Sequence, residues 1–72
     1  MKKMRMTEQE RELFEPIFLK KENQNRPIKI NGKTYEYCTA MNNLREIKQQ
    51  GTTTVGILIG FYIGKKLMIV TY

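Results

Sequence analysis

The sequence predicts an α+β protein in which an N-terminal helix packs on a roughly four-stranded antiparallel sheet made of two β-hairpins joined by a short helix. Three observations support this fold class. A capping-box motif near the N-terminus is followed by an apolar stripe with helical spacing. Two later stretches are rich in strand-forming residues, and each contains a two-residue turn signal, Asn31-Gly32 in the first and Gly64-Lys65 in the second.

The length of 72 residues corresponds to one domain, which we place at residues 7–72 after a basic tail at residues 1–6. A domain this small has a small core and marginal stability, which disulfides, metals or self-association often support. Cys38 is the only cysteine, so an internal disulfide is excluded. The chain has no His and no Asp, and we therefore expect no metal site. Self-association is the remaining means of support.

Residues 7–21, TEQERELFEPIFLKK, are predicted to form the first helix. Thr7 and Glu10 have capping-box spacing. Pro16 lacks a backbone donor and is expected to kink the helix or to split it near Glu15. The polar residues 22–27 form a linker into the first strand. The apolar stripe of this helix consists of Leu13, Phe14, Ile17 and Phe18.

Residues 28–40, IKINGKTYEYCTA, are predicted to form the first hairpin. Asn31-Gly32 favours a type I′ turn, which places Ile30 opposite Lys33 and Ile28 opposite Tyr35. One face carries Ile28, Ile30, Tyr35 and Tyr37, and the other carries Lys29, Thr34, Glu36 and Cys38. For Cys38 we favour a packing role over a reactive thiol.

Residues 43–50 are predicted to form the short helix between the hairpins. Asn43 and Glu46 have capping-box spacing, Leu44 and Ile47 fall on one side, and Gly51 follows as a C-terminal stop. An extended connection is the alternative.

The tail from residue 52 to 72 admits two interpretations. Gly56, Gly60 and Gly64 recur at every fourth position, a spacing that resembles a transmembrane packing seam. A spanning helix needs about 20 apolar residues, however, and Lys65 and Lys66 interrupt the run. The β-branched and aromatic content favours strands, so we predict a hairpin and do not expect membrane attachment.

A Gly64-Lys65 turn places Phe61 opposite Met68. The predicted core face is Val55, Ile57, Ile59, Phe61, Met68, Val70 and Tyr72. The opposite face is also apolar, so it is covered either by a second layer of the same chain or by a partner. The predicted partner interface consists of Leu58, Gly60, Tyr62, Leu67 and Ile69. A small curled barrel of SH3-like type, with a bend at Gly56 or Gly60, is the alternative fold.

Thirteen Lys and Arg face seven acidic residues, which gives a net charge of +6. A basic surface favours anionic partners. Both hairpin turns carry lysines, and turns at one end of a sheet are expected to grip phosphates. The predicted nucleic-acid-binding residues are Lys29, Lys33, Arg45, Lys48, Lys65 and Lys66.

Enzymatic chemistry is not expected, because a chain without Ser, His or Asp cannot form the usual triads. We expect no cofactor and no small-molecule substrate. The N-terminus has no apolar run of a signal peptide, which favours a cytoplasmic location. The sequence thus predicts a small binding or regulatory protein, of a kind that would suit a phage or mobile element, with nucleic acid or another anionic partner. The alternative is a protein-binding module or inhibitor that uses the apolar sheet face, including as a homodimer.

Overall fold

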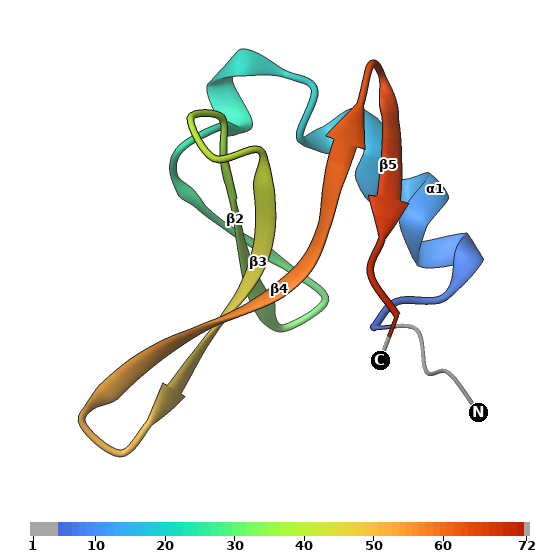
Figure 1. The fold of residues 1–72 in the computed structure, drawn as a ribbon. Coiled ribbons are helices and arrows are strands. Elements are labelled where there is room, and N and C mark those ends of the chain that lie inside the picture. The colour runs from blue at the N-terminus through green and yellow to red at the C-terminus, as the bar shows by residue number, and fades with distance from the viewer. Residues whose placement is uncertain (1–4, 72) are drawn as a thin grey trace.

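The computed structural model describes residues 5–71 and shows one helix on a curled, five-stranded antiparallel sheet, which confirms the α+β class (Figure 1). The strands follow the chain in the order β1-β2-β3-β4-β5, so the first and last strands form the two edges of a half-barrel. The sheet has one strand more than predicted. The elements are α1 Glu8–Ile17, the 3₁₀ turn η1 Lys21–Asn23, β1 Pro27–Ile30, β2 Lys33–Cys38, β3 Asn43–Gln50, β4 Thr53–Ile63 and β5 Lys66–Ile69.

Helix α1 begins at the predicted capping box. The Glu10 amide donates to Thr7 Oγ1 at 3.1 Å, and the Thr7 amide donates to Glu10 Oε1 at 3.0 Å. The helix ends at Ile17, one residue after Pro16, instead of splitting at Glu15. Phe14 and Phe18 are buried, whereas Leu13 is 50% exposed, so the apolar stripe is narrower than predicted.

The first hairpin has the predicted register, with Ile28 opposite Tyr35 and Ile30 opposite Lys33. Asn31 and Gly32 both have positive φ angles, of 51° and 80°, as a type I′ turn requires. Tyr35 and Tyr37 are buried on the predicted inner face.

Residues 43–50 form strand β3, so the prediction of a short helix is wrong. The Leu, Arg, Glu, Lys and Gln side chains of this segment favour a helix locally. Tertiary pairing overrides that preference, because β4 is 11 residues long while β5 has only four. Strand β3 instead pairs with β4 from Gln50–Thr53 to Leu44–Gly60 and thereby supplies its backbone partners.

A bulge in β4 changes which side chains of its second half point toward the core. Arg45 pairs with Leu58 and Leu44 pairs with Gly60, which leaves Ile59 as an extra residue. Ile59 and Gly60 are consequently both buried, and the inward positions beyond them are even-numbered. A β-carbon on Gly60 would meet the carbonyl group of Met68, so only glycine fits at this position.

The predicted core face of the last hairpin is therefore correct for Ile59 and wrong for Phe61 and Met68, which are exposed. Val55 and Ile57 are half-buried but do not pack against the core cluster. Tyr72 lies outside the described residues. The predicted pairing itself is confirmed, because Phe61 is opposite Met68 and Ile63 is opposite Lys66.

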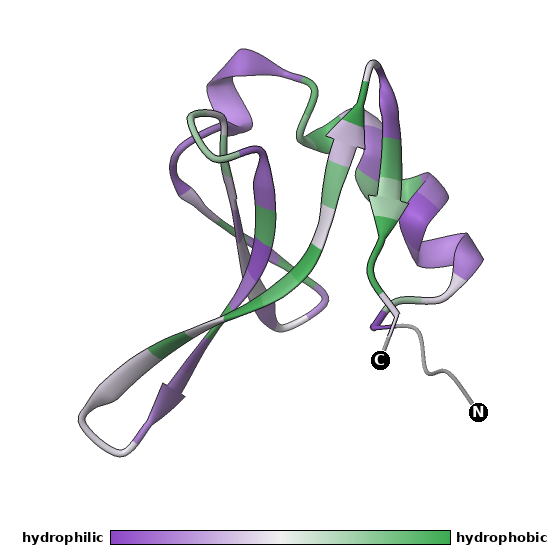
Figure 2. Ribbon diagram, in the orientation of Figure 1, coloured by the Kyte–Doolittle hydropathy of each residue, from purple (hydrophilic) through white to green (hydrophobic). Residues whose placement is uncertain are grey.

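The core lies between α1 and the concave face of the sheet, where the apolar segments of helix and strands converge (Figure 2). The ring of Tyr35 meets Phe14 edge-on at 4.7 Å, and Tyr37 meets Tyr62 edge-on at 5.1 Å. Met6 belongs to this core, although it lies in the predicted basic tail. The buried residues are Met6, Phe14, Phe18, Tyr35, Tyr37, Leu44, Ile59, Tyr62 and Leu67.

Strands β3 and β4 extend beyond the rest of the sheet as a projecting hairpin (Figure 1). Strand β2 pairs with β3 only as far as Ile47, and the described pairing of β5 with β4 ends at Gly60. In the described ladder of β3 and β4, residues 48–57, which we call the arm, pair with one another and with Glu46 and Ile47.

Candidate binding surface

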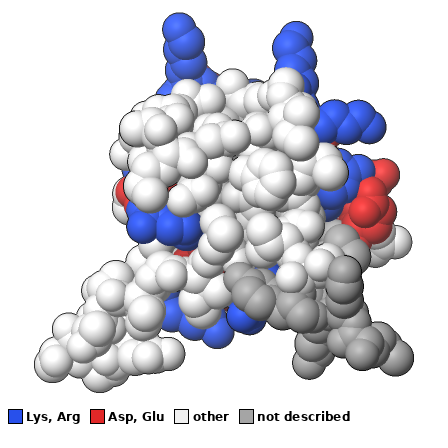
Figure 3. All heavy atoms as spheres, viewed as in Figure 1, with Lys and Arg blue, Asp and Glu red and all other residues white. Residues whose placement is uncertain are grey.

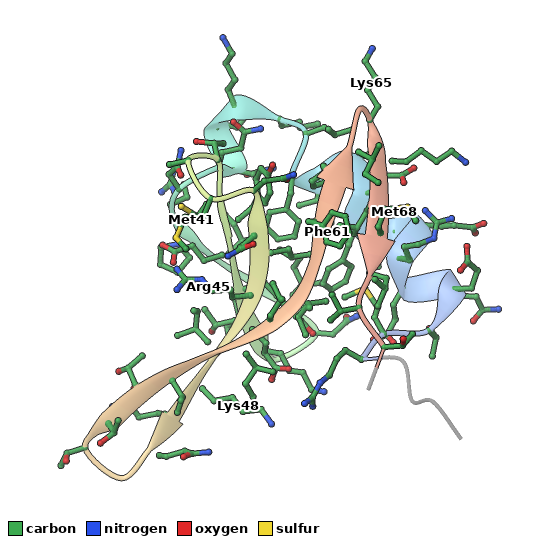
Figure 4. All side chains as sticks on the ribbon, in the orientation of Figure 1. Met41, Arg45, Lys48, Phe61, Lys65 and Met68 are labelled. Carbon is green, nitrogen blue, oxygen red and sulfur yellow. The ribbon has the colours of Figure 1, made fainter. Side chains whose placement is uncertain are left out.

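The six residues predicted to bind nucleic acid do not gather at one end of the sheet. Lys33 follows the turn between β1 and β2, and Lys65 lies in the turn between β4 and β5. The meander order places these two turns at opposite ends, so the prediction that both turns grip phosphates at one end is wrong. Figure 4 likewise shows Lys48 and Lys65 far apart. Lys29 lies on the edge strand β1.

Arg45 is held flat against the sheet by two neighbours. Its Nη2 atom lies 2.7 Å from Glu36 Oε1 on the adjacent strand, where the two residues are direct partners. Its side chain crosses Gly56, and a β-carbon there would lie 3.4 Å from Arg45 Cδ. Glu36 thus already compensates much of the charge that Arg45 would offer to a phosphate.

The residues predicted as a partner interface are mostly covered by the chain itself. Gly60, Tyr62 and Leu67 are buried, and Ile69 packs against the core. Leu58 is half-buried. Of the two alternatives for this face, a second layer of the same chain or a partner, the structure shows the first, because α1 covers this face of the hairpin.

Glu15 fixes α1 on the hairpin with two of its groups. The Tyr62 hydroxyl donates to the backbone oxygen of Glu15 at 2.6 Å, and the Leu67 amide donates to the carboxylate at 2.7 Å. Burial raises the pKa of the Tyr62 phenol, and the charge of Glu15 adds to the shift. The phenol therefore remains a neutral donor at physiological pH.

The reversal in β4 places three apolar side chains on the outside of the β4–β5 hairpin, which we call the outer patch: Phe61, Ile63 and Met68. They are 37%, 60% and 42% exposed. Phe61 and Met68, both labelled in Figure 4, are direct cross-strand partners. Lys66 pairs with Ile63 at the end of the hairpin. Figure 3 shows this side of the molecule as largely uncharged, with basic side chains at its rim. No pattern in the sequence indicates this patch directly, because the assignment of faces assumes that side chains alternate strictly along a strand, and a bulge breaks that alternation.

A groove of about 320 Å³ adjoins the outer patch at Met68, between α1 and β5. In this groove, Arg11 Nη2 lies 2.6 Å from Glu8 Oε1, and Arg11 Nη1 lies 2.8 Å from Glu15 Oε2. Its hydrogen bond to Glu8 lowers the pKa of that carboxyl group. The acids beside Arg11 balance its charge, so the groove is not an anion site. Its lining residues are Glu8, Arg11, Lys66, Leu67, Met68 and Ile69.

Among residues 5–71, no three metal-ligating side chains gather in one place, and no helix is long and apolar enough to cross a membrane. Comparisons of the chain with protein-family models, with curated proteins and with solved structures give no match. The candidate site therefore rests on geometry alone, and the outer patch is its central feature.

Proposed function

We propose that this protein is a non-enzymatic binding module that engages an acidic protein through the outer patch. The carrying observation is the adjacent exposure of Phe61, Ile63 and Met68 on a hairpin anchored to α1. Adjacent exposed apolar side chains on a small protein are typical of interaction surfaces. Aromatic residues and Met are enriched in the central part of such interfaces.

The charge of the chain supports an acidic partner. The net charge is +6, and Lys65 and Lys66 form the end of the hairpin that carries the outer patch. Basic groups at the rim of an apolar interface accelerate association with an acidic surface and disfavour basic competitors. Apolar contact thus supplies affinity, and the lysines supply attraction and selectivity.

Affinity capture from host lysate tests this proposal when the protein and two variants serve as bait. Phe61→Ala removes the central aromatic side chain of the outer patch. Leu13→Ala is the matched control, because it truncates an exposed apolar side chain of α1. We expect the same protein to be captured by wild type and Leu13→Ala, with or without nuclease, and to be lost with Phe61→Ala. Equal capture by all three baits contradicts the proposal.

Nucleic acid is the second candidate partner, favoured by the position of Phe61 on the same hairpin as two lysines. An exposed aromatic ring can stack on an unpaired base while neighbouring lysines contact phosphates. Gel shifts with single-stranded DNA and RNA over a series of salt concentrations test this alternative. Binding that weakens steeply with salt and is lost in Phe61→Ala supports it, and absence of binding at low salt excludes it.

A further inference from the structure

The two faces of the arm differ in how their polar side chains are engaged. Side chains alternate across a strand, so Gln49 and its partner Thr54 lie on one face of the ribbon. The Thr54 hydroxyl donates to Gln49 Oε1 at 3.0 Å on that face. Gln50 and its partner Thr53 lie on the opposite face, at the exposed end of the arm. We call this second face the inner face, because it continues the side of β3 that carries the buried Leu44.

Two lysines are neighbours on the inner face at the base of the arm. Thr34 and Ile47 are direct partners on β2 and β3. Lys33 and Lys48 adjoin them, so the two lysines face one another across these strands. Lys48 Nζ lies 3.9 Å from Glu46 Oε2, half of the Lys48 side chain is exposed, and Figure 4 shows it beside the base of the arm. None of the ion pairs among residues 5–71 includes Lys33. The two lysines against one carboxylate therefore leave this base positively charged.

We propose that the arm lies in the major groove of duplex DNA, with its inner face toward the base edges. The major groove is about 12 Å wide and admits a two-stranded β-ribbon. The Gln50 amide can form a bidentate pair with adenine, and the methyl groups of Thr53 and Val55 can contact thymine. Lys33 and Lys48, at the base of the arm, then contact phosphates and fix its position on the duplex.

Charge and composition select duplex DNA among the possible partners of the arm. The chain has a net charge of +6 and residues 49–64 contain no acidic residue, so the arm does not repel phosphates. Residues 48–57 contain no aromatic ring on which an unpaired base could stack, which disfavours single strands. The major groove of duplex RNA is too deep and narrow for side chains to read. The exposed Gln and Thr side chains also lack the aromatic and Met content that is typical of protein interfaces.

Gel shifts of the full chain over a series of salt concentrations test the choice of ligand. The probes are a mixed-sequence DNA duplex, the same sequence as duplex RNA, and its single DNA strand. We expect the DNA duplex to bind about tenfold more tightly than the other two probes. Lys48→Ala should weaken binding to the DNA duplex about three- to tenfold and lower the slope against log salt by about 0.9. Lys65→Ala removes the same charge far from the arm and should change binding by less than about twofold (Figure 4). Absence of duplex binding at low salt, equal binding of the three probes, or equal losses in the two variants overturns the proposal.

Selection of sites from a randomised DNA duplex library tests which face of the arm reads the bases. Gln50→Ala should lose a preference of about fivefold or more for adenine at one position of the selected site. Gln49→Ala is the matched control on the opposite face and should select the same sites as wild type. The same loss in both variants, or no loss in Gln50→Ala, overturns the assignment of the inner face. Capture of a protein that resists nuclease and is lost with Gln50→Ala would assign the arm to a protein partner and also overturn it. Phe61→Ala should bind the duplex like wild type, so these results are independent of the outer patch.

Discussion

The body of the sheet and its arm are built from the same two strands, β3 and β4, but they gain stability in different ways. In the body, Leu44 and Ile59 are buried against α1 and the neighbouring strands. In the arm, Gln50 and Thr53 pair across the ladder yet remain exposed. Backbone pairing is thus continuous along the hairpin, whereas none of the side chains of the arm is fully buried.

This contrast between body and arm shows that backbone pairing and side-chain packing contribute separately to the free energy of unfolding. A two-stranded ribbon is at best marginally stable in water, so the arm depends on the packed body for its order. Substitutions in the body should therefore alter the free energy of unfolding of the whole domain. Substitutions in the arm should mainly alter its local opening.

Loss of a central aromatic side chain of the core between α1 and the sheet should have the largest effect. Phe14 is fully buried and its ring meets Tyr35 edge-on. Phe14→Ala should cost about 3–5 kcal/mol, because it removes a large apolar side chain and leaves a cavity. Urea denaturation followed by circular dichroism measures this loss. The neighbouring Leu13→Ala should change stability by less than about 0.5 kcal/mol, and an equal loss in both variants would contradict the described burial.

The two glycines of β4 should respond differently to a methyl group. At Gly60 the added carbon meets the backbone of β5, which cannot move without breaking the hairpin pairing. Gly60→Ala should therefore cost about 1–3 kcal/mol, as overpacking does. At Gly56 the neighbour is the flexible side chain of Arg45, which can shift. Gly56→Ala should be much milder in the same urea titration, and the reverse order would contradict the position of the bulge.

The body could be predicted from the sequence better than the border with the arm. Local signals with one dominant physical cause succeeded, as with the Thr7 capping box and the Asn31-Gly32 turn. The register at Gly64-Lys65 was also accessible, because glycine-first turns have a preferred geometry. Each of these features depends on neighbouring residues only.

The features that depend on distant partners could not be decided from the sequence, which left an extended segment at residues 43–50 as an alternative. Residues 43–50 have helical propensity, and only the need of β4 for a partner makes them a strand. The bulge at Ile59 follows from the fit of β3 against β4 and leaves no periodic trace in the sequence. The candidate outer patch follows from that bulge. Strict alternation therefore assigned Phe61 and Met68 to the core, whereas the structure exposes them.

Alkaline pH should destabilise the body and leave the arm without a direct response. Burial raises the pKa values of Tyr35, Tyr37 and Tyr62, all in the core, and the arm has no tyrosine. Below the ordinary tyrosine pKa of about 10, folded and unfolded states are both protonated and these groups confer no pH dependence. Above it, the unfolded state loses protons first, so stability falls as pH rises. Each tyrosine should contribute up to about 1.4 kcal/mol per pH unit, up to its raised pKa.

Urea titrations at pH 9 to 11 measure this slope, and Tyr37→Phe provides the comparison. The variant should be less stable at pH 9, because it loses the hydrogen bond of 2.7 Å to the Asn42 side chain. Its stability should also decline less steeply above pH 10, since one ionising group is absent. Identical slopes for wild type and variant would show that Tyr37 is not the source of the pH dependence.

The smallest effect on stability is expected in the arm, where Thr53→Ala should change the free energy of unfolding by less than about 0.5 kcal/mol. Hydrogen exchange gives a sharper comparison, because arm amides open locally while body amides exchange only through larger unfolding. In a dilute sample of monomer, the Thr53 amide should exchange far faster than the buried Leu44 amide. If the Thr53 amide exchanges as slowly as the Leu44 amide, the arm is as stable as the body, and the contrast between the two regions is one of exposure alone.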